Sequence, residues 1–125
     1  RSVGLTYAVG KASAGAVEHM LVARVQNLPR LLEDLKQKGV WAYAADMDGS
    51  PWVQADLTGP CALIIGAEGR GVSRLVKETA DFVLSLPIKG KVNSLNASVA
   101  AGVLCCEVAR QRSGLQACNP KGRET

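Results

Sequence analysis

Two short segments of the chain contain most of the side chains that could take part in chemistry. The first places three glycines around a glutamate, in the order Gly66-Ala67-Glu68-Gly69-Arg70-Gly71. The second is Ser94-Leu95-Asn96, which lies between a Pro-Gly loop and a stretch of small residues with helical character. Glycines expose main-chain N–H and C=O groups to a ligand, and serine and asparagine side chains can hydrogen-bond a reacting hydroxyl. These two segments are therefore the candidates for a binding and catalytic site.

The glycine segment does not fit the common nucleotide-binding loops. The dinucleotide fingerprint is G-x-G-x-x-G after the first strand, with the pyrophosphate at a helix N-terminus. Here the order is inverted, and Glu68 places an anion where a diphosphate would approach. A Walker loop is excluded because no Gly-Lys-Ser/Thr follows the glycines. S-adenosylmethionine has no phosphate and carries a sulfonium cation, so it suits the segment better.

Each candidate residue also has a purely structural explanation. Gly66, Gly69 and Gly71 could form a tight turn from strand to helix that needs positive φ angles, and such a turn is compatible with ligand binding. Ser94 could cap the last helix, and Glu68 could be an ordinary surface residue. The asparagine two positions after the serine is different, because an amide in the first helical turn contributes little to helix stability.

The spacing of apolar residues predicts alternating strands and helices. Strands are expected at 20–25, 40–45, 61–65 and 82–86, with a loop at 46–60. Helices are expected around 12–17, from a cap at Asn27 to Gly39, from a cap at Ser73 to Ala80, and at 96–112. Continuously aliphatic strands separated by helices indicate an α/β fold, a parallel sheet with flanking helices. The last helix is apolar nearly all round, so we expect it to be enclosed.

Composition limits the classes of protein that the chain can represent. With 125 residues, 47% of them hydrophobic and 4% aromatic, it is expected to form one domain with a small aliphatic core. No apolar run approaches the ~18 residues of a membrane span, so we expect a soluble, cytoplasmic protein without a membrane partner. The net charge of +4 permits an anionic partner. The four cysteines include no C-x-x-C pair and His19 is the single histidine, so we expect no metal and buried, reduced cysteines.

In order and spacing, segments 63–73 and 86–102 resemble the second and third motifs of the SpoU (TrmH) family of RNA ribose 2′-O-methyltransferases, which belongs to the SPOUT class. The resemblance runs from about residue 1 to residue 112. It implies a SPOUT-type C-terminal trefoil knot, a catalytic domain at 1–112, S-adenosylmethionine as cofactor, and a homodimer in the full-length parent. Residues 113–125 lack apolar periodicity and are expected to form a flexible basic tail.

The resemblance also assigns roles to individual residues. It gives Ser94 and Asn96 catalytic roles, and Glu68 the role of organising the site. Segment 11–18 is similar to the linker region of RlmB-type members, which modify a guanosine of large-subunit ribosomal RNA. The expected cofactor-binding positions are Ala45, Gly66, Ala67, Glu68, Gly69, Leu86, Ile88, Ser94 and Leu95. The expected RNA-binding positions are Lys11, Glu18, Arg70, Lys89 and Lys91.

The expected function is therefore methyl transfer from S-adenosylmethionine to a ribose 2′-hydroxyl of RNA, in a guanosine of large-subunit ribosomal RNA. The alternatives are a tRNA ribose methyltransferase, a non-catalytic RNA- or nucleotide-binding module, and a structural α/β interaction domain. The first motif of the family supplies an asparagine and an arginine, and residues 1–18 contain no match to it. From this we expect an N-terminally truncated domain that is inactive by itself.

Overall fold

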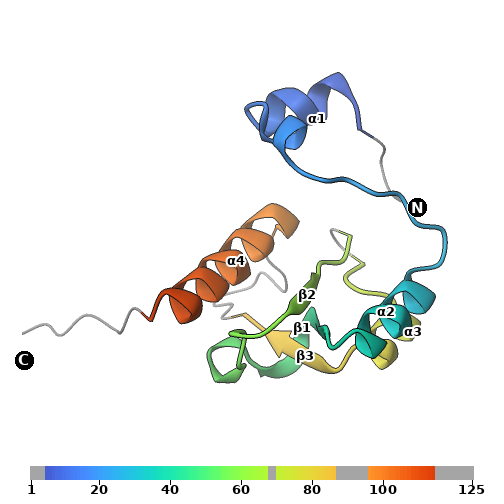
Figure 1. Ribbon diagram of the computed structural model, residues 1–125, viewed down its shortest axis with the longest axis vertical. Helices are drawn as coiled ribbons and strands as arrows, with labels where there is room; N and C mark the ends of the chain where they lie inside the picture. The colour runs from blue at the N-terminus through green and yellow to red at the C-terminus, as the bar shows by residue number, and fades with distance from the viewer. Residues whose placement is uncertain (1–4, 68–69, 87–95, 115–125) are drawn as a thin grey trace, which may run out of the picture.

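The structure is a computed structural model of the chain, and it describes residues 5–67, 70–86 and 96–114 (Figure 1). Its centre is a parallel sheet with the strand order β2-β1-β3. The strands are β1 (Trp41–Pro51), β2 (Cys61–Ile64) and β3 (Phe82–Ser85). The helices are α1 (Tyr7–Ala12), α2 (Leu28–Gln37), α3 (Arg74–Thr79) and α4 (Ala97–Ser113), with short 3₁₀ helices η1 (Ala16–His19) and η2 (Trp52–Gln54). The predicted α/β class, with a parallel sheet and flanking helices, is confirmed.

Helices cover the sheet on both faces, because successive side chains of a strand point to opposite faces. Ala44 of β1 lies in a buried cluster with Leu32 of α2 and Val76 of α3. The preceding residue, Tyr43, lies in a second buried cluster with Leu104 of α4. Figure 1 accordingly shows α4 on the other side of the sheet from α2 and α3. The result is a three-layer arrangement whose described core consists of Leu, Ile, Val and Ala side chains together with the buried Tyr43.

Two of the helices begin at the caps that the sequence predicts. Before α2, the side chain of Asn27 accepts a hydrogen bond of 3.1 Å from the backbone N–H of Arg30. Before α3, the hydroxyl of Ser73 accepts one of 3.4 Å from the backbone N–H of Val76. Gly39 follows α2 with a φ of +83°, a left-handed conformation that glycine adopts without strain. Local side-chain chemistry therefore sets these helix boundaries.

Helix α4 is not enclosed, and this prediction from its apolar composition is wrong for the part of the chain that the structure describes. Leu104 on its inner face is fully buried, whereas Val99 is 50% exposed. Cys105 and Cys106 are exposed as well, so the expectation of buried cysteines is also wrong at these two positions. The physical reason is that α4 packs on the sheet through one face only, and no other described element covers its outer face. None of the described helices is long and apolar enough to cross a membrane.

The N-terminal segment differs from the prediction in two ways. Residues 20–25 do not form a strand, and Met20, Leu21, Val22 and Val25 have exposed side chains. A strand depends on hydrogen bonds to a neighbouring strand, and within the described ranges none pairs with this segment. The first helix, α1, also begins earlier than the predicted range of 12–17, because Thr6 caps it by accepting a hydrogen bond from Val9.

The predicted loop at 46–60 is partly strand. Strand β1 continues to Pro51, and both Ala45 and Ser50 are paired with Leu84 of β3, so the residues between them form a bulge. Gly49 lies in this bulge, where a Cβ would overlap the backbone that joins Val83 to Leu84. The turn-forming composition of residues 46–60 predicted a loop, but hydrogen bonds to β3 keep the first part of this segment in the sheet.

Candidate cofactor-binding site

Two predicted cofactor-binding positions, Gly66 and Leu86, follow the ends of β2 and β3, and a third, Ala45, lies within β1 at the neighbouring level. Ala44 is paired with Ile64 of β2 and with Val83 of β3, so the three strands are in register at this level. One residue further along β1 is Ala45, and Gly66 and Leu86 follow shortly after the other two paired residues. Ligands of parallel α/β sheets bind at the carboxyl ends of the strands. The register therefore places these three positions close to the level at which β2 and β3 end, where a ligand is expected.

Backbone contacts close the glycine segment into a tight turn. The N–H of Gly71 donates a hydrogen bond of 2.8 Å to the carbonyl of Ala67, and the N–H of Arg70 donates one of 3.2 Å to the same oxygen. Gly71 has a φ of +69°. A Cβ at Gly66 would overlap the backbone of Gly71 and Val72. The need for glycine is therefore conformational at Gly71 and steric at Gly66, which agrees with the structural explanation of the sequence pattern.

Asp46 is a further residue of this region that sequence reasoning missed. It directly follows Ala45, and its carboxylate lies beside the glycine segment, 3.6 Å from a Cβ built on Gly71. The Nζ of Lys77 on α3 is 3.2 Å from Oδ2 of Asp46 and 3.4 Å from Oδ2 of Asp48. The sequence signal that could have identified Asp46 is its position, because it is an acidic residue directly after the predicted strand 40–45, at the end where ligands bind.

The ion pair keeps both of its main partners charged. Burial acts to raise the pKa of Asp46, but the hydrogen bond and the positive charge of Lys77 outweigh it, so the pKa is lowered from its usual value. The hydrogen bond to Asp46 in turn raises the pKa of Lys77, against a smaller opposing effect of desolvation. A carboxylate close to an open glycine backbone is chemically suited to a cationic ligand and poorly suited to a phosphate.

Asn96 is the N-cap of α4, and this corrects two statements made from the sequence. Its Oδ1 accepts a hydrogen bond of 2.9 Å from the backbone N–H of Ser98 and also accepts one from the Ser98 hydroxyl. The cap is therefore Asn96 and not Ser94, and the asparagine does contribute to the helix. The other predicted site residues of this region and of the glycine segment lie outside the described residues: Glu68, Gly69, Ile88, Lys89, Lys91, Ser94 and Leu95.

Three of the predicted RNA-binding residues, Lys11, Glu18 and Arg70, are described, and the structure does not gather these three in one place. Arg70 is exposed on the glycine segment at the strand ends. Lys11 and Glu18 are exposed on α1 and η1, and α1 contains no buried residue. Figure 1 shows this N-terminal segment well separated from the sheet. In this arrangement the structure does not bring Lys11 and Glu18 to the candidate site.

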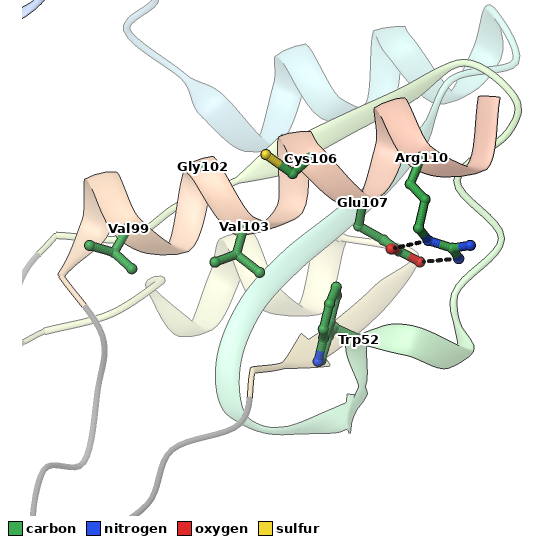
Figure 2. Close-up of a pocket in the computed structure, with 7 residues that line it drawn as sticks. All are labelled: Trp52, Val99, Gly102, Val103, Cys106, Glu107 and Arg110. Carbon is green, nitrogen blue, oxygen red and sulfur yellow. Dashed lines mark hydrogen bonds and ion pairs between the residues drawn. The ribbon is translucent and has the colours of Figure 1, made fainter. Parts of the chain in front are cut away.

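A separate groove lies between α4 and η2, on the side of α4 from which Val103 and Glu107 point toward Trp52 (Figure 2). It has a volume of about 570 Å³. Its floor is mainly apolar, and Trp52 of η2 lies opposite Val103 of α4. The lining residues are Trp52, Val99, Gly102, Val103, Cys106, Glu107 and Arg110. An open apolar groove of this kind is typical of a surface that contacts another macromolecule.

Gln111 joins the C-terminal half of α4 to the connection between β1 and β2, and the buried Glu107 bonds to Gln111 and Arg110 within the helix. The side chain of Glu107 is 4% exposed, and its carboxylate accepts hydrogen bonds of 2.8 and 2.9 Å from the guanidinium of Arg110. Gln111 also donates to Glu107, donates to the carbonyl of Ala55, and accepts a hydrogen bond of 2.7 Å from the N–H of Leu57. Hydrogen bonds from Arg110 and Gln111 lower the pKa of Glu107 to about 2. The carboxylate is thus ionised at neutral pH although it is buried.

The sequence of the chain matches the SpoU rRNA Methylase family over residues 1–106. Over 114 residues it is 54% identical to the "Putative TrmH family tRNA/rRNA methyltransferase YacO" of Bacillus subtilis, covering 90% of this chain and 46% of that protein. It is 47% identical to the "23S rRNA (guanosine-2'-O-)-methyltransferase RlmB" of Ralstonia nicotianae, with the same two coverages. The chain therefore spans less than half the length of these relatives.

Solved structures give the same result for the fold. The A. aeolicus TrmH/SpoU tRNA modifying enzyme matches with a TM-score of 0.78 and 30% identity, over 84% of this chain and 54% of that one. The SpoU methyltransferase AviRb of Streptomyces viridochromogenes, in complex with its cofactor AdoMet, matches with a TM-score of 0.76 and 26% identity, over 83% of this chain and 44% of that one. AdoMet is S-adenosylmethionine, the cofactor that the sequence predicts. The family prediction is thus confirmed, and the chain belongs to the SpoU rRNA methylase family.

Proposed function

We propose that this chain forms the cofactor-binding and catalytic part of an RNA methyltransferase, which transfers the methyl group of S-adenosylmethionine to a ribose 2′-hydroxyl. The proposal is supported by the strand register, which puts Ala45 one residue beyond the level at which Ala44 pairs with Ile64 and Val83, with Gly66 and Leu86 following shortly after those two residues. The glycine segment suits the cofactor, because its turn leaves no room for a Cβ at Gly66 and the carboxylate of Asp46, which is paired with Lys77, lies beside Gly71. We assign the catalytic domain to residues 1–112 and the tail to 113–125.

The proposed substrate is a guanosine of large-subunit ribosomal RNA, methylated in the cytoplasm. The name of the Ralstonia nicotianae relative, a 23S rRNA (guanosine-2'-O-)-methyltransferase of 47% identity, supports this substrate. The name of the Bacillus subtilis relative includes both tRNA and rRNA, so a tRNA ribose is the second candidate. Methyl transfer to each purified RNA, followed by mass spectrometry of the nucleosides, distinguishes the two.

The reaction requires the 2′-hydroxyl to be held in line with the methyl group and to lose its proton. When bound, S-adenosylmethionine supplies the electrophilic methyl group. The side chains of Ser94 and Asn96 orient the ribose hydroxyl, and Glu68 organises the site between the glycine segment and the segment that precedes α4. In this proposal Asn96 has two roles, since its Oδ1 also caps α4 through Ser98.

The two roles of Asn96 can be separated by substitution. Aspartate caps a helix as well as asparagine does but lacks the amide N–H groups, whereas alanine removes the cap at a cost of about 1 kcal/mol. In the full-length parent, we expect Asn96→Asp to melt close to the wild-type temperature and still to lose about 100-fold in turnover, with little change in cofactor affinity. Asn96→Ala should lose both stability and turnover. Wild-type turnover in Asn96→Asp, or methylation of a base nitrogen by the wild-type protein, would contradict the proposal.

Two further features of the family are proposed for this protein, a trefoil knot and a homodimer. The apolar groove between α4 and η2 supports the dimer, because it is open to solvent and Val99 of α4 on its lining is 50% exposed. A crystal structure of the protein with S-adenosylmethionine tests both features. We expect the chain on either side of α4 to pass through a loop, and a second copy to cover Val99 and Val103. A chain trace outside all loops, or a monomer with this groove open to solvent, would refute the corresponding feature.

A further inference from the structure

A lysine on α3 holds together the end of β1 and the helix that follows the glycine segment. The ammonium group of Lys77 contacts the carboxylates of Asp46 and Asp48 at 3.2 and 3.4 Å. We call these three residues the Lys77 clamp. The side chains of Lys77 and Asp46 are only 26% and 16% exposed, whereas that of Asp48 is 66% exposed. The ion pair between Lys77 and Asp46 is therefore less exposed to water than the ion pair between Lys77 and Asp48, and it is the more directional of the two.

The C-terminal end of the glycine segment lies beside the Lys77 clamp. Its last residue, Gly71, lies against the carboxylate of Asp46, and α3 begins three residues later. Val72 and Val76 anchor the start of α3 in the buried cluster, independently of any charge. The apolar contacts therefore hold α3 on the sheet, while the clamp fixes where the end of β1 lies relative to the glycine turn.

We infer that Lys77 is a positioning residue for cofactor binding, acting through Asp46 on the backbone of the glycine segment. The inference rests on the proposed function, because it takes this segment as part of the cofactor site. Without Lys77, Asp46 would be a partly buried carboxylate with no ammonium partner, and it would turn toward water. The bulge of β1 would move with it, and the backbone surface offered to the ligand would change.

The same helix provides a matched control. Arg74 and Glu78 form an ion pair of 3.0 Å between side chains that are 89% and 59% exposed. Exposed pairs of this type contribute little to structure. Glu78→Gln therefore removes one charge and one ion pair from α3 without touching the end of β1.

The direct effect of charge and the positioning effect have opposite signs at Lys77. The bound cofactor carries a sulfonium cation, so removing a nearby ammonium group would by itself strengthen binding. If Lys77 positions the glycine segment, Lys77→Met should instead weaken binding of S-adenosylmethionine, by about tenfold. Lys77→Arg should restore most of the affinity, because it restores the ion pair. Asp46→Asn combined with Lys77→Met should weaken binding by less than the product of the two single effects, because both substitutions break one contact.

The experiment measures the dissociation constant of S-adenosylmethionine by calorimetry and the melting temperature of each variant without ligand. We expect Lys77→Met to melt below Glu78→Gln, because it leaves the partly buried carboxylate of Asp46 unpaired, but to be fully folded at the titration temperature and still to lose affinity there. Affinity equal to or above wild type in Lys77→Met would overturn the inference. The inference would also be overturned if Lys77→Met were partly unfolded at the titration temperature, so that unfolding explained its loss of affinity, and if Lys77→Arg did not restore that affinity. If the wild-type protein itself does not bind S-adenosylmethionine, or if Gly66→Ala binds it normally, the proposed function fails instead.

Discussion

Gly66→Ala is expected to weaken binding of S-adenosylmethionine by at least about 100-fold, because the added Cβ has no place in the turn. It would overlap the backbone of Gly71 and Val72, so the whole glycine segment must move to admit it. A ligand read by main-chain groups is sensitive to such a movement. Calorimetric titration of the variant with S-adenosylmethionine measures the effect.

Gly59→Ala is the matched control for this substitution. Gly59 lies in the connection between β1 and β2, and a Cβ there would have no neighbour within 4 Å. We expect its affinity and its melting temperature to equal those of the wild type. Normal affinity in Gly66→Ala would show that the cofactor does not bind at the glycine segment. The buried anchors Val72 and Val76 are expected to keep α3 folded in the variant.

Glu107→Gln is expected to destabilise the protein by about 2 kcal/mol at pH 7, since it removes charged hydrogen bonds from a buried site. The cost stays below that of a fully buried pair, because the side chain of Arg110 is 47% exposed and can return to water. Chemical denaturation of the variant and the wild type measures the difference. Glu78→Gln removes an exposed carboxylate and should cost much less.

The destabilisation should depend on pH in a defined direction. Hydrogen bonds from Arg110 and Gln111 lower the pKa of Glu107 from 4.5 to about 2 in the folded protein. A carboxyl group with a lowered folded-state pKa stabilises the fold fully above its unfolded pKa, and this contribution is lost as the pH falls toward the folded pKa. The free energies of unfolding of wild type and Glu107→Gln should therefore converge between about pH 4.5 and pH 2. A difference that stays constant over this range would contradict the role of the charge.

The central elements could be predicted from the sequence because local signals specify them. The aliphatic runs at 40–45, 61–65 and 82–86 all contribute strands, and Asn27 and Ser73 cap the helices that they were expected to cap. The strand expected at 20–25 is absent because an apolar pattern cannot say whether a hydrogen-bonding neighbour exists. The extension of β1 beyond Ala45 has the converse cause, since pairing with β3 overrides a turn-like composition.

At the candidate site too, some features could be predicted from the sequence and others could not. The resemblance to the family assigns Ala45, Gly66 and Leu86 to one cofactor site, and this grouping stays a prediction. The contact between Asp46 and Lys77 joins residues 31 positions apart, and that between Leu57 and Gln111 joins residues 54 apart. No local pattern marks such contacts, since they depend on how the layers pack. The capping role of Asn96 was not predicted, because the predicted helix began at residue 96 and α4 begins one residue later.

The bond from the N–H of Leu57 to the side chain of Gln111 also bears on the order in which the fold can be completed. A ribosome releases Leu57 long before the residue that satisfies its N–H, which lies 54 positions later. Until then, this N–H can bond only to water or to a temporary partner. The hydrogen bond between the connection and α4 therefore forms only after α4 has been synthesised and has docked on the sheet.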